Sequence, residues 1–161
     1  MKMLKIVFVL LTLTYSPVSA AEPKLVLGEN IKVGMKLNEV FKLLGPPETL
    51  ASTRGTGLDS DSISLKYSGE GLLLHVISGT NKIEVIEATK GFKGKFASGL
   101  TLGSEYKKLF EIYGLPKSLS SNVARYSKLG LKFVISNDKV FSATLFNKKS
   151  KHLLVRQITQ E

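Results

Sequence analysis

Few residues of this chain are suited to acid–base, nucleophilic or metal chemistry. It has no cysteine and two histidines, His75 and His152. A thiol nucleophile and a thiolate metal site are therefore excluded. His75 lies within the apolar run Leu72–Ile77, so we expect a strand residue that is either partnered or exposed at an edge, rather than a catalytic base. His152 follows a cluster of lysines, so we expect it to be solvated. The HExxH, GxSxG and P-loop patterns do not occur.

The carboxylates also form no recognisable catalytic or metal-binding set. Asp59 and Asp61 stand close together, but the ligand pattern of an EF-hand calcium loop does not follow. Glu84 and Glu87 have an odd spacing, which in a regular strand places them on opposite faces. We therefore expect no catalytic residue, no metal, no cofactor and no enzymatic activity. The alternative left open is an enzyme that acts on an envelope polymer through carboxylates that the sequence does not pair.

Positive charge is the more informative feature. The chain has 23 Lys and Arg against 13 Asp and Glu, a formal net charge of +10. Lysines alternate with Phe92 and Phe96, a mixture typical of nucleic-acid binding. The N-terminal segment described next predicts export from the cytoplasm, which argues against a nucleic-acid partner. The mixture also suits an acidic protein surface or an anionic membrane surface, although lysines that simply keep the chain soluble remain an alternative. The candidate anion-binding or partner-binding residues are Arg54, Lys90, Lys93, Lys95, Lys148, Lys149 and Lys151.

The first twenty residues have the features of a secretory signal peptide. Lys2 and Lys5 precede an apolar run from Ile6 to Leu13, and small residues follow, with Val18 and Ala20 at the −3 and −1 positions. The apolar run is short for a membrane span, which needs about 20 apolar residues, so a retained anchor is the less favoured alternative. The sequence predicts cleavage after Ala20 and a periplasmic or secreted protein.

One stretch of the chain occurs twice. Residues 31–48 and 100–117 align without a gap, and the second copy repeats a Gly, a Phe, a Gly and a Pro of the first at an offset of 69 residues. In both copies apolar residues recur at i, i+3, i+4 and i+7, which predicts a short amphipathic helix that ends at the second Gly. The apolar residues are Leu37, Val40, Phe41 and Leu44 in the first copy, and Tyr106, Leu109, Phe110 and Tyr113 in the second.

Strand-like segments follow each helix. Alternation or continuous apolar character predicts strands over 63–67, 72–77 and 83–88, and again over 123–126, 131–135 and 140–146. The polar stretches 49–61 and 117–122 are interpreted as loops. The predicted fold class is α+β: two tandem units of a short helix plus a three-stranded antiparallel meander, with the helices on one sheet face. The expected boundaries are 1–20 for the signal peptide, 21–92 and 93–147 for the units, and 148–161 for a basic tail.

The repeated motif resembles that of a known family. Val33-Gly34, Val40, Leu43-Leu44-Gly45 and Pro47 are similar to the motif of the SmpA/OmlA family of outer-membrane assembly lipoproteins, which belongs with proteins of the β-lactamase-inhibitor-protein fold. Unlike that family, the chain has no lipid-bearing cysteine, and it carries two units where the assembly protein has one. The resemblance implies a non-catalytic binding protein of the bacterial cell envelope that recognises another protein or an anionic envelope component.

The predicted cleavage can be tested directly. We expect Edman sequencing of the exported protein to begin at Ala21, because Val18 and Ala20 fit the small pockets of a signal peptidase. A protein that is exported but still begins at Met1 would contradict cleavage and favour the retained anchor.

Overall fold

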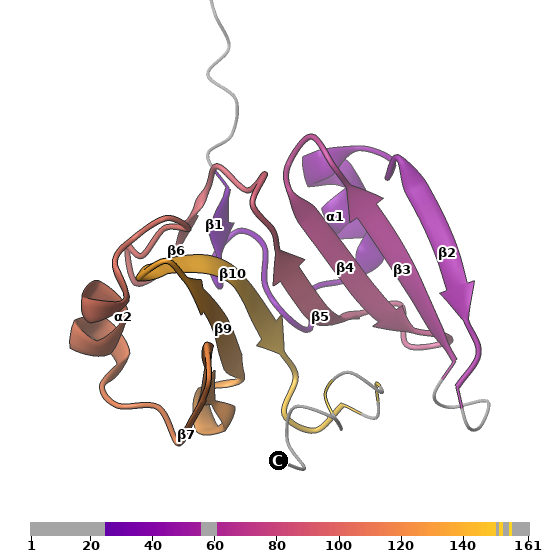
Figure 1. Cartoon of the computed structure of the whole chain (residues 1–161). Coiled ribbons are helices and arrows are strands. Elements are labelled where there is room, and N and C mark those ends of the chain that lie inside the picture. The colour runs from indigo at the N-terminus through magenta and orange to yellow at the C-terminus, as the bar shows by residue number, and fades with distance from the viewer. Residues whose placement is uncertain (1–24, 56–60, 151, 153–154, 156–161) are drawn as a thin grey trace, which may run out of the picture.

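A computed structural model describes residues 25–55, 61–150, 152 and 155. In this part of the chain, eight strands form one antiparallel sheet in the order β2-β3-β4-β5-β10-β9-β8-β7 (Figure 1). Two further strands, β1 (Val26–Leu27) and β6 (Lys95–Phe96), pair in parallel. The strands of the large sheet are β2 (Thr49–Thr53), β3 (Ser62–Tyr67), β4 (Leu72–Ile77), β5 (Ile83–Ala88), β7 (Ser118–Ser120), β8 (Val123–Tyr126), β9 (Leu131–Ser136) and β10 (Lys139–Phe146).

The two predicted helices form at the repeated stretch. Helix α1 spans Leu37–Leu44 and α2 spans Tyr106–Tyr113, eight residues each. Val40 and Leu109, at the centre of the two apolar faces, are completely buried, because a helix this short is stable only when packed on other elements. Both helices end at a Gly with positive φ, 73° at Gly45 and 72° at Gly114, a backbone conformation that side-chain-bearing residues rarely adopt.

The same contacts recur in the two halves after each helix. The hydroxyl of Tyr67 donates to the carbonyl of Gly45 at 3.1 Å, and that of Tyr126 donates to Gly114 at 2.8 Å. Each tyrosine is the last residue of a strand, Tyr67 of β3 and Tyr126 of β8. The hydrogen bond therefore ties the end of that strand to the C-terminal end of the helix. The second half contains one additional short element, the 3-10 helix η2 (Ser127–Leu129), in the turn after β8.

The prediction of two α+β units, each a helix plus a three-stranded meander, is wrong. The described chain is mostly β, and its large strands belong to one continuous sheet. The segments predicted as loops contain the edge strands β2 and β7, which pair with β3 and β8. Both are short and rich in Ser and Thr, and β2 is exposed along its whole length, so neither shows the apolar alternation by which a half-buried strand is recognised.

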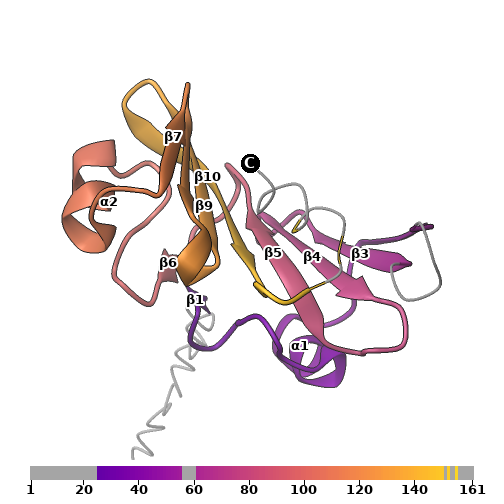
Figure 2. The same ribbon diagram turned by 90° about the horizontal axis from the view of Figure 1, so that it is seen from below.

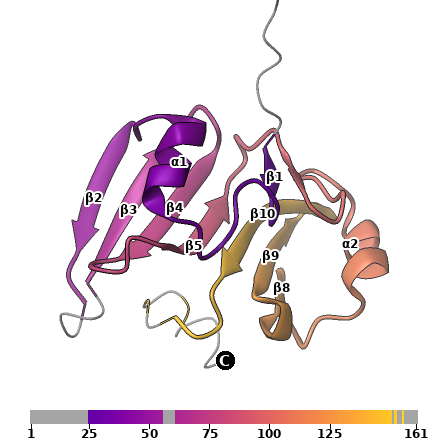
Figure 3. The same cartoon turned by 180° about the vertical axis from the view of Figure 1, so that it is seen from behind.

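Pairing of β5 with β10 joins the halves at the middle of the sheet. In this pairing Ala88 lies opposite Ala143, and Ile86 lies opposite Leu145. Both helices pack on the same face of the sheet, where Val40 and Leu109 share one core with the inward residues of the strands (Figure 3). The parallel pair of β1 and β6 contributes Leu27 and Phe96 to this core.

The opposite face of the sheet carries a second, smaller cluster. Val85 and Phe146 pack there with Val155, beyond the end of β10. Figure 2 shows β10, from whose end this part of the chain continues, between β5 and β9. We call this side of the sheet, defined by Val85 and Phe146, the tail face.

Within the described residues, neither helix has the length or the apolar character that crossing a membrane would require.

A matched pair of glycine substitutions tests the packing between the two connections of the first half. A methyl group at Gly71, where φ is 64°, would overlap the backbone of Gly91 and Phe92, whereas a methyl group at Gly45 meets open space. Positive φ costs both alanine variants about 1–3 kcal/mol. We expect Gly71→Ala to lose clearly more stability than Gly45→Ala in urea denaturation. Equal losses would show that the close approach does not constrain the fold.

Candidate functional site

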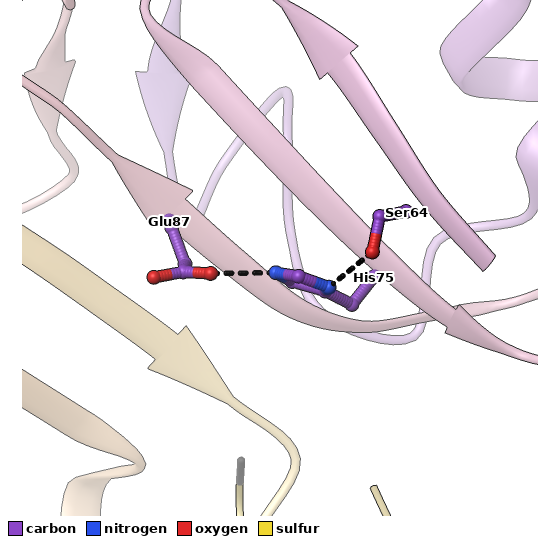
Figure 4. Close-up of polar contacts among 3 residues, drawn as sticks. All are labelled: Ser64, His75 and Glu87. Carbon is purple, nitrogen blue, oxygen red and sulfur yellow. Dashed lines mark hydrogen bonds and ion pairs between the residues drawn. The ribbon is translucent and has the colours of Figure 1, made fainter. Parts of the chain in front are cut away.

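A chain of three hydrogen-bonded polar side chains crosses the tail face. Ser64 on β3 lies directly opposite His75 on β4, and its Oγ is 2.9 Å from Nδ1 of the imidazole (Figure 4). Nε2 of His75 lies 2.6 Å from Oε1 of Glu87 on β5. His75 is only 7% exposed, and these two contacts give both of its ring nitrogens a hydrogen-bond partner within the sheet, as buried polar groups need. Of the two alternatives expected for His75, a partnered strand residue or one exposed at an edge, the structure shows the first.

Glu87 shares a row of the sheet with a lysine. Thr144 on β10 lies opposite Glu87, and Lys132 on β9 lies opposite Thr144, so one row of the sheet carries all three residues. The hydrogen bond from His75 is the main cause that lowers the pKa of Glu87, and the charges of His75 and Lys132 add to it. Glu87 is therefore ionised at neutral pH.

His152 completes this cluster from beyond the end of the sheet. Its ring lies 5.1 Å from the ring of His75, centroid to centroid, and the residue is only 4% exposed. The expectation that His152 is solvated is therefore wrong. Val155, three residues further, packs with Val85 and Phe146, and this apolar contact holds His152 against the sheet. Burial lowers the pKa of His152, and the neighbouring His75 lowers it further.

Ser64, His75 and Glu87 are the residue types of a serine hydrolase triad, but their placement favours a structural role. In the chymotrypsin-type triad the serine bonds Nε2 and the carboxylate bonds Nδ1, and here the two nitrogens are exchanged. Ser64 also lies in a strand that is paired on both sides, with β2 and β4. Backbone N–H groups of such a strand point at neighbouring strands, whereas an oxyanion hole needs donors directed at a substrate.

The argument that Glu84 and Glu87 lie on opposite faces fails because β5 is irregular. His75 pairs with Val85 and Val76 pairs with Ile83, so Glu84 is an extra residue in a β-bulge. The bulge shifts the alternation, and Ile83 and Ile86 share the core although they are three residues apart.

The carboxylates of Glu84 and Glu87 nevertheless bind different partners: Glu84 accepts from Nδ2 of Asn147 at 3.0 Å, and Glu87 bonds His75.

The structure does not gather the predicted partner-binding cations into one site. Arg54 is exposed beyond the end of β2, and Lys90, Lys93 and Lys95 lie in and around the connection from β5 to β6. Phe92 and Phe96 from the same connection are buried in the core. Lys148 and Lys149 are exposed after β10, and Lys151 lies outside the described residues, as does Asp59. Asp61 accepts a hydrogen bond from the backbone N–H of Gly55 at 2.8 Å.

Other lysines line hollows on the surface, and sequence reasoning missed them; two of these hollows also contain exposed apolar side chains. The first hollow, about 530 Å³, is lined by residues of α1 and of the β4–β5 turn: Lys36, Leu37, Asn38, Phe41, Thr80, Asn81 and Lys82. The second, about 370 Å³, lies where the end of α2 meets the turn after β8, and is lined by Tyr113, Leu115, Lys117, Tyr126, Ser127, Lys128 and Leu129. Their lysines come from distant segments, so they form no cluster in the sequence.

Among the residues that the structure describes, no group of three or more His, Cys, Asp or Glu side chains could hold a metal ion. Comparisons of the chain with protein-family models, curated proteins and solved structures found no match. The resemblance to the SmpA/OmlA family therefore stays a prediction from the repeated motif.

The lowered pKa of His152 predicts a pH-dependent stability. The unfolded chain takes up a proton near the ordinary pKa of 6.5, whereas the folded chain resists it, so the free energy of unfolding should fall as the pH drops below about 6.5. Between about pH 7.5 and 5.5, Glu87 stays ionised in both states, because its ordinary pKa is 4.5 and folding lowers it. We expect His152→Gln to lose less stability than the wild type across this range in urea denaturation. An unchanged loss would show that His152 does not cause the pH dependence.

Proposed function

We propose that this chain is an exported, non-catalytic binding protein of the bacterial cell envelope, and that it recognises an acidic surface of another protein. The signal-peptide pattern supports export, and the repeated motif with its family resemblance supports an envelope role. Removal of the predicted signal peptide, which holds Lys2 and Lys5 and no acidic residue, lowers the formal net charge from +10 to +8. This positive charge favours an acidic partner, because complementary charge steers association.

The observation that carries the proposal is the pairing of exposed apolar side chains with lysines. Leu115 is 85% exposed and Leu129 is 56% exposed, and both line the second hollow together with Lys117 and Lys128. Phe41, 41% exposed, lines the first hollow, as do Lys36 and Lys82. Apolar anchors with a polar rim are the usual composition of a protein–protein interface. A lysine rim selects a partner that carries carboxylates.

The buried polar chain of the tail face supports binding over catalysis. Ser64, His75 and Glu87 satisfy one another across three strands, and none of them lines either of the two hollows described above. An enzyme needs its reactive groups directed into the space that the substrate fills.

Capture from an envelope extract tests the proposal. We expect the immobilised mature protein to retain specific proteins at about 50 mM salt and to release most of them at about 500 mM, because screening weakens attraction between exposed charges. An unrelated protein of equal net charge is the control. Retention of the same proteins by the control, or of none by this chain, would contradict the proposal. Binding to phosphatidylglycerol vesicles without any protein capture would also contradict it, in favour of membrane attachment.

A further inference from the structure

The two halves build the same corner where a helix end meets the turn after the second strand. In the first half, the N–H of Glu48 donates to the carbonyl of Lys66, and in the second, the N–H of Lys117 donates to Arg125, both at 3.0 Å. The adjoining turns match as well: Gly71 donates to Ser68 and Gly130 donates to Ser127, both at 3.2 Å. Lys117 therefore occupies the backbone position of Glu48.

In the first corner, the side chain of Glu48 is a bound carboxylate. Its two oxygens accept hydrogen bonds from the N–H groups of Ser68, at 3.0 Å, and Gly69, at 2.9 Å. A hydrogen bond from the Ser68 side chain is the largest cause that lowers the pKa of Glu48, and the two backbone hydrogen bonds add to it. The first half thus shows that the turn is built to hold a carboxylate.

In the second corner, the residue at the position of Glu48 carries no carboxylate. Lys117 stands in its place, and an ammonium group cannot accept a hydrogen bond. The serine is kept as Ser127, whereas Gly69 and Glu70 of the first turn are replaced by Lys128 and Leu129. Over these three positions, Glu48, Gly69 and Glu70, the second corner therefore loses two carboxylates and gains two ammonium groups and an exposed leucine.

The second corner has room for a carboxylate from outside. Its residues line the open hollow of about 370 Å³. At the first corner, a Cβ added to Gly69 would lie 3.6 Å from Oε1 of Glu48, an ordinary contact distance, so the Cβ that Lys128 carries at this position is compatible with an oxygen at the same place. Nζ of Lys148 donates to the carbonyl of Lys128 at 2.9 Å and brings a third ammonium group to this corner.

We propose that the second corner is the docking site for an acidic peptide segment of the partner protein, which presents a carboxylate next to a bulky apolar side chain. The carboxylate takes the place that the Glu48 side chain holds in the first corner, between the turn at Ser127 and Lys128 and the ammonium of Lys117. The apolar side chain lies against Leu115 and Leu129, which are otherwise exposed to water. This site rests on the proposed function, because it names where that partner binds.

Peptide titration followed by NMR tests the ligand chemistry. The probes are Ac-Gly-Leu-Glu-Leu-Gly-NH₂, its Gln counterpart, and Ac-Gly-Leu-Leu-OH, which separates a side-chain carboxylate from a C-terminal one. With ¹⁵N-labelled mature protein, we expect saturable shifts of the Ser127 and Lys128 amide signals with at least one of the two carboxylate peptides. The Gln peptide should bind about tenfold more weakly or not at all, because a neutral amide lacks the charge-assisted hydrogen bonds. Shifts that are equal for Glu and Gln, or that map elsewhere, would overturn the proposal.

Lys117→Glu and Lys117→Gln form a matched pair of variants. Lys117→Glu supplies the carboxylate from the chain itself, so we expect a higher urea midpoint than in Lys117→Gln and a loss of peptide binding of about tenfold or more. Lys117→Gln removes the charge without filling the corner and should bind the peptide with an intermediate affinity. A Lys117→Glu variant that still binds as well as the wild type would overturn the site.

The capture experiment separates this failure from failure of the proposed function. If Lys117→Glu retains the envelope partner as well as the wild type does, the corner is not the docking site, and the protein remains a binding protein. If the wild type captures no partner, the proposed function fails, and this docking site fails with it, even where the peptide still binds the corner as an isolated carboxylate site.

Discussion

The pairing of β5 with β10 is the constraint on which the whole architecture depends. Without it the chain would be two four-stranded sheets, each with a short helix on one face and an additional unpaired edge. Two alanines, Ala88 and Ala143, face each other in this pairing, and the bulky pair Ile86 and Leu145 lies beside them. The continuous sheet allows the two eight-residue helices to share one core, which neither helix could form alone. It also aligns Glu87 with Thr144 and Lys132 in one row, so the polar cluster of the tail face spans both halves.

The sequence predicted the elements that have a strong apolar period, and it failed where polarity or irregularity hid the pattern. The helices over 37–44 and 106–113 and the strands over 63–67, 72–77 and 83–88 form close to the expected positions. The edge strands β2 and β7 bury little, so their Ser and Thr residues carry no alternation, and their omission made the predicted units one strand too small. The bulge at Glu84 shows a further limit, because one extra residue reverses the faces on which all later residues of a strand lie.

The surface sites were harder to predict than the fold, for a different physical reason. Binding residues are brought together by folding, and Lys117 and Lys128 meet only because a helix end and a turn form one corner. The lysines that are close in the sequence, such as Lys90 and Lys93, instead lie in a connection whose aromatic residues face the core. The repeat did contain a usable signal: aligning its two copies places Lys117 on Glu48, a reversal of charge within an otherwise similar motif.

The exposed edges of the sheet have a consequence for self-association. β2 ends the sheet on one side with Thr, Leu, Ala, Ser and Thr, and it carries no charged residue that would block pairing with a foreign strand. Copies of a chain with a positive net charge, +10 before and +8 after the predicted cleavage, repel one another in dilute buffer. This repulsion opposes contact between edges over a longer range than any single side chain could. Added salt shortens that range to about 10 Å or less. Concentrated, salty stocks are therefore the conditions under which edge-to-edge oligomers of this protein would nucleate.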